Sequence, residues 1–542
     1  MILIMTSCLD LDQYPQDTIT DVIYWQTIDD FEKAANELYF SLESFPSDYD
    51  TDFMTGNNLS SISNGTYLAG PSDGIWYNCY GYIRMCNYLL EKYESSSIKD
   101  DIKKYKGEAL FFRSYMYFKM YKYYGALPII TSVLDINSSD LYKGRDSREA
   151  VENFILQDIE EAIDLLPVSS GDKQKGRITK GAALAFKSRV ALFIGTWAKF
   201  HGTRSNYKEI LSMAVDASMK IIDGSGTEGK KYSLYTGKSL DSYRYLFIDE
   251  GDNSSESILD SRYYYQIRTH GNTYGWAWGT SGCPTKKFAD MYLCIDGLPI
   301  DKSPLFKGYD QIKSEYENRD PRMLQTLLIP GEEYITSEVH TPLIVPYSFT
   351  DRPTTRTGYR VHKFIGEKFY AKVGDCEYDA HVIRYAEVLL NYIEAKFERD
   401  EKVSDEDLFL TIHELRKRVG MDIDLTNDFV EKYNLDMRTE IRRERAVELA
   451  FEGFRYDDIR RWKTAEVELP MSLRGVKISD TEWEEKLGDA VMDLNIDEEG
   501  FVVVEEASKR TFETPKHYLY SLPLQQLQMN PNLKPNNPGW PN

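Results

Sequence analysis

The segment that decides the fold reads IRRERAVELAFEGFRYDDIRRW, from Ile441 to Trp462. Its apolar residues recur at a helical spacing, which predicts one long helix with an apolar face. Opposite charges are spaced to pair along this helix: Arg445 with Glu448, Glu452 with Arg455, and Asp457 with Arg460 and Arg461. Each exposed pair contributes only about 0.3–0.5 kcal/mol, so pairing along the helix does not explain so many charges. Gly453 costs about 1 kcal/mol relative to Ala in mid-helix, which predicts a kink or a backbone passing close by.

The closing segment, YLYSLPLQQLQMNPNLKPNNPGW from Tyr518 to Trp540, has a different character. Its prolines forbid a continuous helix or a central strand. A chain end of this composition is commonly disordered. Apolar residues nevertheless recur along it, namely Leu519, Leu522, Leu524, Leu527, Leu533 and Trp540. We therefore expect an extended strap that these residues fasten to the body.

The composition narrows the classes of function. The 542 residues carry a formal charge of −22, and 40 of them are tyrosines. The acidity argues against binding to nucleic acid or, through a basic patch, to an anionic membrane. So many tyrosines suggest a surface or groove that uses some of the rings. The sequence contains no run of 18 apolar residues, so it predicts no membrane-spanning helix.

Helical periodicity predicts helices at both ends of the chain and an irregular middle. The expected helices start at Asp29 and near Tyr82, and cover residues 106–124, 147–166, 179–200, 207–222, 380–400, 406–419 and 438–463. Residues 48–81 predict a loop, residues 224–379 predict loops with short strands, and residues 501–504 predict one strand. Helix pairs at both ends fit a solenoid, such as one built of tetratricopeptide units of about 34 residues.

The two quoted segments together resemble the SusD-like (RagB/SusD) family of outer-membrane nutrient-binding lipoproteins of Bacteroidetes. In that family a helix of the form ERR.EL..EG.R..D..RW precedes a tail of the form L.PIP......NP.L.QNPGW. Here Leu522-Pro523-Leu524 replaces Pro-Ile-Pro, and Asn536 replaces Gln. Shorter matches follow the family order through nearly the whole chain, among them Gly107-Glu108-Ala109.

The resemblance implies a mostly α fold, in which tetratricopeptide-like helix pairs carry an irregular, loop-rich middle and a few short strands. Residues 29–542 would form a single domain. Its parts would be N-terminal helix pairs over 29–223, a loop-rich ligand-facing region over 224–379, C-terminal helices over 380–465, and closing loops with the strap over 466–542.

The first residues, Met1 to Cys8, resemble the end of a lipoprotein signal peptide, with small residues before the cysteine. The apolar stretch is short and lacks a basic leader, so either translation starts upstream or the segment is not a signal. The family resemblance favours the first reading. Residues 1–7 would then be removed, and residues 8–28 would be a tether lipidated at Cys8. Acidic residues after Cys8 resemble signals for the outer face of the cell, so we expect an outer-membrane protein anchored by lipid at the cell surface.

The strongest candidate for ligand binding is the stretch YYYQIRTHGNTYGWAWGTSGC, from Tyr263 to Cys283. Glycines let a loop bring aromatic faces close to a ligand, and sugar faces stack on Trp and Tyr. Nearby polar side chains would then bind hydroxyl groups. The candidate residues are Arg268, Asn272, Tyr274, Trp276 and Trp278. The alternative is that the two tryptophans pack onto the helical body.

A second candidate lies between Pro71 and Tyr82. Trp76 and Tyr80 match the scaffold pattern of the family, so we expect them in the core. Asp73, Tyr77 and Asn78 are the better candidates for ligand contact.

The sequence carries no recognisable signature of chemistry. The seven histidines show no HExxH pattern, and no GxSxG occurs. The cysteines beyond Cys8 are odd in number and form no CxxC, which argues against a disulfide framework or structural zinc. We expect no catalytic residue, metal or cofactor. Carboxylates that meet only in the fold would still allow a glycoside hydrolase.

The resemblance therefore implies a non-enzymatic lipoprotein that binds an oligosaccharide or polysaccharide at the cell surface. It would work with a SusC-like TonB-dependent transporter in nutrient uptake and would touch the membrane through its lipid anchor only. A peptide-binding member of the same family is the alternative, and a glycoside hydrolase is the minor one.

Overall fold

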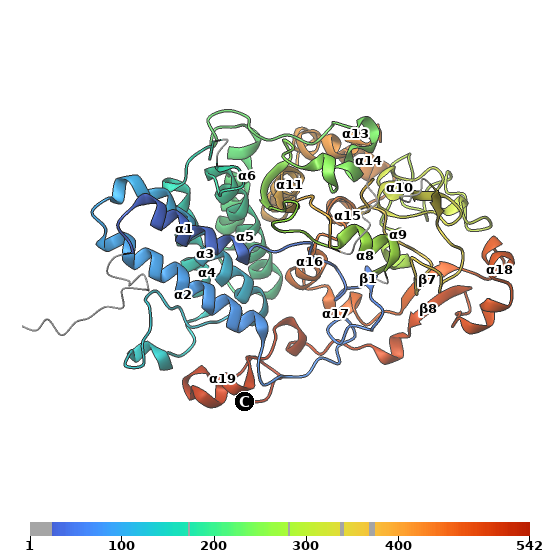
Figure 1. Cartoon of the computed structure of the whole chain (residues 1–542). Coiled ribbons are helices and arrows are strands. Elements are labelled where there is room, and N and C mark those ends of the chain that lie inside the picture. The colour runs from blue at the N-terminus through green and yellow to red at the C-terminus, as the bar shows by residue number, and fades with distance from the viewer. Residues whose placement is uncertain (1–23, 172–173, 280–281, 337–340, 368–373) are drawn as a thin grey trace, which may run out of the picture.

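The computed structural model describes residues 24–171, 174–279, 282–336, 341–367 and 374–542. It shows the predicted mostly α fold, with an irregular half beside a helical half (Figure 1). The expectations for residues 1–23, including lipidation at Cys8, lie outside the described residues.

The N-terminal half is a stack of antiparallel helix pairs. Its helices are α1 (Ile28–Leu38), α2 (Gly74–Ser95), α3 (Lys99–Tyr124), α4 (Arg148–Leu165), α5 (Lys180–His201) and α6 (Tyr207–Ile222). Polar caps fix where they begin: the side chain of Ser147 accepts a hydrogen bond from Ala150 N, and that of Asp73 accepts one from Ile75 N. This cap starts α2 at Gly74, so the prediction of a loop up to residue 81 was wrong.

The C-terminal helices are α11 (Tyr385–Asp400), α12 (Asp405–Leu408), α13 (Glu414–Arg418), α14 (Asn427–Lys432), α15 (Met437–Glu448), α16 (Arg455–Arg461), α17 (Ala465–Glu468), α18 (Glu482–Leu487) and α19 (Leu524–Met529). Of these helices, α11 and α16 pack against the N-terminal stack. A π-helical turn, Phe409–His413, joins α12 to α13, so the expected helix over 406–419 is continuous but contains this turn.

The middle of the chain consists of short elements joined by loops. Its helices are α7 (Ser242–Tyr245), α8 (Asn272–Trp278), α9 (Lys286–Ala289) and α10 (Arg322–Thr326). The strands are β1 (Met54–Thr55), β2 (Ser257–Ser261), β3 (Cys283–Pro284), β4 (Glu333–Thr336), β5 (Pro342–Ile344), β6 (Ala380–Arg384), β7 (Leu473–Lys477) and β8 (Phe501–Glu505). They pair antiparallel as β1–β3, β2–β6, β4–β5 and β7–β8. The predicted strand at 501–504 is β8.

Two large hydrophobic cores stabilise the fold. The larger lies among α2–α6 and α11, and it contains many of the tyrosines, including Tyr105, Tyr117, Tyr121 and Tyr124 of α3. Trp76 is buried there as predicted. The second core joins the middle elements to α15 and β7, around Tyr243, Phe288 and Tyr359. The cysteines at 79, 86, 283, 294 and 376 are all buried and free.

The fold-deciding segment is broken in the middle, so the prediction of one long helix was wrong. Helix α15 ends at Glu448 and α16 begins at Arg455. Gly453, between them, has φ +79°, and a Cβ added to it would lie 2.6 Å from Cβ of Pro46. The predicted close approach is therefore confirmed. Asp48 accepts hydrogen bonds from Phe451 N and Arg455 N and satisfies backbone donors at the break.

Charges of this segment pair across its break and with distant parts of the chain. Arg445 binds Asp458 across the break at 2.9 Å, and Arg455 binds the distant Asp52 at 2.7 Å. The predicted pairs Arg445–Glu448 and Glu452–Arg455 were therefore wrong, because these side chains face inward to different partners. The pair Asp457–Arg460 forms as predicted at 2.7 Å, but the predicted pair Asp457–Arg461 was wrong, because Arg461 binds Asp458 at 2.8 Å.

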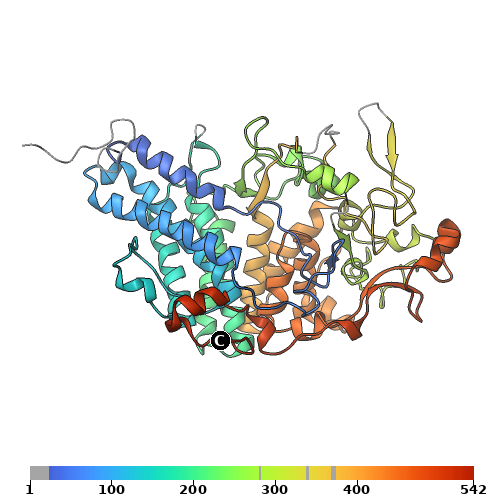
Figure 2. The same ribbon diagram turned by 60° about the horizontal axis from the view of Figure 1, so that its bottom comes forward.

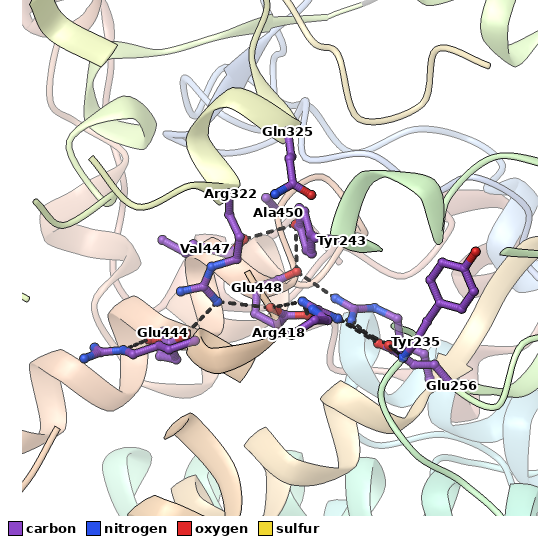
Figure 3. A network of polar contacts seen from close by, with 12 residues as sticks. Tyr235, Tyr243, Glu256, Arg322, Gln325, Arg418, Glu444, Val447, Glu448 and Ala450 are labelled. Carbon is purple, nitrogen blue, oxygen red and sulfur yellow. Dashed lines mark hydrogen bonds and ion pairs between the residues drawn. The ribbon is translucent and has the colours of Figure 1, made fainter. Parts of the chain in front are cut away.

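Glu448 lies at the centre of a buried charge network (Figure 3). The network comprises Glu256, Asp320, Glu444, Glu448, Glu452, Arg322, Arg384, Arg416, Arg418 and Lys363. Glu448 lies 2.7 Å from Arg384, 2.8 Å from Arg418 and 3.0 Å from Arg322. Burial alone would raise the pKa of the Glu448 carboxyl, but these guanidinium groups lower it far below its usual range. The dense charges of the segment are thus internal cross-links between α15 and the middle of the chain.

The C-terminal strap is fastened as predicted. Leu522, Leu527, Leu533 and Trp540 are all buried. The Asn537 amide donates to the carbonyls of Tyr124 and Tyr520, and Trp540 Nε1 donates to the Leu519 carbonyl at 2.8 Å. The prolines of the strap prevent regular helix or sheet hydrogen bonding, and these side-chain bonds satisfy backbone carbonyls instead.

Candidate ligand-binding site

Strand β2 leads into a short turn that we call the aromatic hairpin, residues Tyr263–Arg268. Tyr264 N donates to the Arg268 carbonyl at 2.9 Å, and Arg268 N donates back to the Tyr264 carbonyl at 3.0 Å. Gln266 at its tip has φ +63°. Because three tyrosines follow one another through so tight a turn, they cannot all face the body.

The tip of this hairpin presents large apolar groups to solvent. Tyr264 is 68% exposed, Tyr265 is 51% exposed and Ile267 is 81% exposed. Adjacent exposed rings of this kind are suited to stacking on a flat apolar face.

The base of the hairpin is held firmly, which makes the exposed rings a fixed surface. Tyr263 N donates to Oδ1 of Asp379 at 2.8 Å, and Tyr265 N donates to Oε2 of Glu377 at 3.2 Å. Arg262 adds an ion pair to Asp379 at 3.1 Å. The anchoring carboxylates therefore come from the strand segment just before β6, which itself pairs with β2.

Charge is concentrated beneath the hairpin. Burial, followed by repulsion from Asp379, raises the pKa of the Asp252 carboxyl to about 7. Burial, and then repulsion from the Asp260 carboxylate, raises the pKa of the Asp379 carboxyl to about 6. Burial would lower the pKa of His381, but its ion pair with Asp260 raises it to about 9. The protonated His381 thus offsets part of this negative charge at neutral pH.

His270 links the hairpin to α8. Its ring lies 4.6 Å from the Tyr263 ring and 4.4 Å from the Phe45 ring. Its Nδ1 accepts from Asn272 N at 3.1 Å, and its Nε2 faces the Tyr378 carbonyl at 3.0 Å. This arrangement requires the neutral imidazole with the proton on Nε2. Burial lowers the pKa of His270 to about 4, so the arrangement holds at neutral pH.

The predicted residues Asn272, Tyr274, Trp276 and Trp278 lie on α8 rather than on an open loop. Trp276 Nε1 donates to Oδ1 of Asn272 at 2.9 Å, and its ring stacks on Phe364 at 5.9 Å. Trp276 and Trp278 are half-buried and pack against the small core around Ile335. The two tryptophans therefore pack partly inward, against the loop-rich half of the molecule rather than against the helical body that the alternative named.

Arg268 and Tyr274 are also half-buried. The Arg268 guanidinium lies 4.4 Å over the Tyr263 ring, and its Nη1 donates to the Arg262 carbonyl. Arg268 thus stiffens the hairpin from within.

The second predicted group, Asp73, Tyr77 and Asn78, lies elsewhere. In Figure 1, α2 is in the left half and α8 in the right half, and Figure 2 shows the red α19 against the blue start of α2. Tyr77 and Asn78 are exposed, but Gln526 Nε2 donates to the Tyr77 hydroxyl at 3.0 Å. The structure therefore does not bring the two predicted groups together.

Tyr264 and Tyr265 were missed as individual site residues, although they stand in the predicted segment. The available signal was the run of three tyrosines followed by Gln-Ile directly after a strand. Consecutive residues of a strand point to opposite faces, so at least one ring of such a run faces outward.

Within the described ranges, no group of three His, Cys, Asp or Glu side chains is placed to hold a metal ion. No helix of the described part is both long and apolar enough to cross a membrane.

Comparison with known proteins gives matches along nearly the whole chain. Residues 245–540 match the SusD family, and residues 10–192 match a family described as starch-binding associating with outer membrane. SusD-like protein P38 of Formosa agariphila is 24% identical over 505 residues, which cover 86% of this chain and 91% of that protein.

Solved structures share the fold. A SusD-like protein of Bacteroides fragilis, 24% identical, superposes with a TM-score of 0.76 over 97% of this chain and 100% of its own. A SusD-like carbohydrate-binding protein of the same species, 21% identical, superposes with a TM-score of 0.75 over 94% of this chain and 100% of its own.

Proposed function

The chain belongs to the SusD family, as its motifs predicted, and we propose that it is a glycan-binding lipoprotein of the cell surface. The aromatic hairpin is the main contact for the glycan. The protein works with a SusC-like TonB-dependent transporter and performs no covalent chemistry.

The observation that carries the proposal is the pair of adjacent exposed rings, Tyr264 and Tyr265, on a hairpin held at its base by Asp379 and Glu377. Stacking on a sugar removes apolar ring surface from water without requiring the ring to move. A hairpin fixed before binding loses little conformational entropy when the ligand arrives. The geometry thus favours reversible capture of a saccharide.

The overall charge narrows the glycan class. A chain with a formal charge of −22 repels polyanions, so a neutral glycan is favoured over a sulfated or uronate-rich one. The carbohydrate-binding relative of Bacteroides fragilis with the same fold supports the saccharide assignment in general terms.

The family described as associating with the outer membrane supports the proposed location. Cys8 would carry the lipid, and several acyl chains together suffice for stable anchoring. Labelling cells with a fatty-acid analogue and comparing wild type with Cys8→Ser tests this anchor. Co-purification with a transporter encoded beside the gene tests the partnership.

The decisive experiment is calorimetry of the full-length protein against a panel of neutral and acidic glycans. Saturable binding to a neutral member, with no release of reducing ends on prolonged incubation, is the expected result. Binding to peptides with no binding to any glycan would overturn the saccharide assignment, and release of reducing ends would establish a hydrolase.

A further inference from the structure

A groove of about 660 Å³ borders the buried charge network at Arg418. We call it the α6–α13 groove, because it runs between the end of α6, the segment 230–240, the first turns of α11, and α13 with its preceding π-helical turn. Figure 1 shows α6, α11 and α13 together at the top of the molecule, apart from α8. Its volume falls in the range of sites for small organic ligands, about 300–1,000 Å³.

The floor of the groove is apolar. Leu389 of α11 is 1% exposed and Ile222 of α6 is 3% exposed. Tyr232, Tyr385 and Leu410 are half-buried around them. This lining matches that of small-molecule sites, in which apolar and aromatic side chains predominate.

Lysines line the mouth of the groove. Lys230 and Lys417 are exposed there, and no carboxylate of the described residues forms an ion pair with either. Glu414 also lines the groove, and the exposed Asp223 attracts Lys230 electrostatically without forming an ion pair with it, which leaves Lys417 as the better placed cation for a ligand. Arg418 also lines the groove, but Glu256 and Glu448 neutralise it.

The walls are held in place from below. Tyr235 N donates to Oε2 of Glu256 at 2.8 Å, which ties the segment 230–240 to the buried charge network (Figure 3). The opposite wall contains the π-helical turn Phe409–His413, and such turns are frequent at functional sites. The groove is therefore formed before any ligand arrives.

We propose that the α6–α13 groove is a second ligand site, separate from the aromatic hairpin, which takes a small organic anion with an apolar body. The apolar part lies on Leu389 and Tyr385, and the anionic group lies at Lys417 and Lys230. The formal charge of −22 opposes a polyanion, which spans many surface charges, but it acts weakly on a small anion, since charges beyond about 8 Å are largely screened at physiological salt. Lys417, which forms no ion pair with a described carboxylate, therefore favours a negative group on the ligand.

The probe is 8-anilinonaphthalene-1-sulfonate, an aromatic anion whose fluorescence rises in apolar sites. Titrated into the full-length protein, it should bind one site saturably. Lys417→Glu should weaken binding about tenfold, because it turns an attraction into a repulsion at the mouth. Leu240→Ser, at a residue 56% exposed on the rim, should weaken it by a smaller factor.

Controls separate this site from others. Lys402→Glu changes an exposed lysine beyond the far end of α11, and should leave the affinity for the probe unchanged. Tyr264→Ala, at the hairpin, should also leave it unchanged. Equal affinity in Lys417→Glu and Lys402→Glu, or loss in Tyr264→Ala, would overturn the proposal.

Displacement of the probe identifies the source of the anion. Decanoate represents an acyl chain and 4-phenylbutanoate represents an aryl acid. Displacement by either supports the proposal and names the kind of apolar body, whereas displacement by neither contradicts it. Glycan binding at the hairpin is measured separately, so failure at one site leaves the other testable.

Discussion

The buried charge network and the aromatic hairpin invert the usual distribution of residues, because the first puts charges inside the protein and the second puts aromatic rings outside. The charges of the network neutralise one another. Glu448 contacts three arginines, and each of these arginines has a further carboxylate partner. Tyr264 and Tyr265 have their backbone anchored but their rings exposed. The difference teaches that the network satisfies its own charges, whereas the hairpin leaves exposed ring surface that the proposed glycan would cover.

Removing the central negative charge of the buried charge network should cause the largest loss of stability. Glu448→Gln leaves Arg384, Arg418 and Arg322 with one negative charge fewer in a buried site, and should reduce the free energy of unfolding by about 3–5 kcal/mol. Urea unfolding measures this loss. Glu406→Gln, at an exposed residue of α12, is the control and should cost less than about 0.5 kcal/mol. A small loss at Glu448 would mean that water reaches the network.

The next largest loss of stability is expected from a substitution at the break between α15 and α16. Gly453→Ala meets both a left-handed backbone and the nearby Pro46, and should cost about 2–3 kcal/mol. Gly202→Ala is a matched control, because Gly202 has φ +68° but nothing within 4 Å of an added Cβ. It should cost about 1–2 kcal/mol. Equal losses in urea unfolding would show that Pro46 moves aside.

The framework could be predicted from the sequence because its signals are local. Apolar spacing and caps located most helices, and the leucines of the strap identified its anchors. Gly453 predicted a close approach at its position, and the structure places Pro46 there. The broken helix and the partner of Arg455 could not be predicted, since they depend on loop residues Asp48 and Asp52, about 400 positions away.

The site was predicted only as a segment. The sequence indicated the stretch from Tyr263 to Cys283, but which rings face solvent depends on how β2 pairs with β6 and where Asp379 holds the turn. Trp276 and Trp278 were predicted to contact a ligand because they stand among glycines, yet in α8 they pack partly inward. Tyr77 resembled a free ring because α19, which binds it, follows more than 440 residues later.

Removing the exposed rings should affect binding and leave the fold intact. The double variant Tyr264→Ala/Tyr265→Ala should lose about 1–2 kcal/mol of glycan affinity, roughly 5- to 30-fold in Kd, because two stacking contacts disappear. Its free energy of unfolding should stay within about 0.5 kcal/mol of wild type. Tyr142→Ala, at a ring 60% exposed elsewhere, serves as control in the same calorimetry. Unchanged glycan affinity in the double variant would remove the hairpin from the site.

The smallest expected effects distinguish two histidines near the hairpin by their pH dependence. Burial would lower the pKa of His381, which lies beneath the hairpin, but its ion pair with Asp260 raises this pKa from 6.5 to about 9. The stability that it contributes is therefore full below pH 6.5 and is lost as pH rises through 9. His270, behind the hairpin, has its pKa lowered to about 4 by burial. Its contribution is full above pH 6.5 and is lost as pH falls through 4.

Glutamine variants of the two histidines make this contrast measurable, because glutamine does not titrate in this range. The difference in free energy of unfolding between wild type and His381→Gln should shrink from pH 6.5 to 9. The corresponding difference for His270→Gln should shrink from pH 6.5 to 4. Subtracting each variant from wild type at the same pH cancels the general effect of acid or base on this acidic chain. Parallel trends in both variants would show that the histidines report a shared global charge rather than two distinct environments.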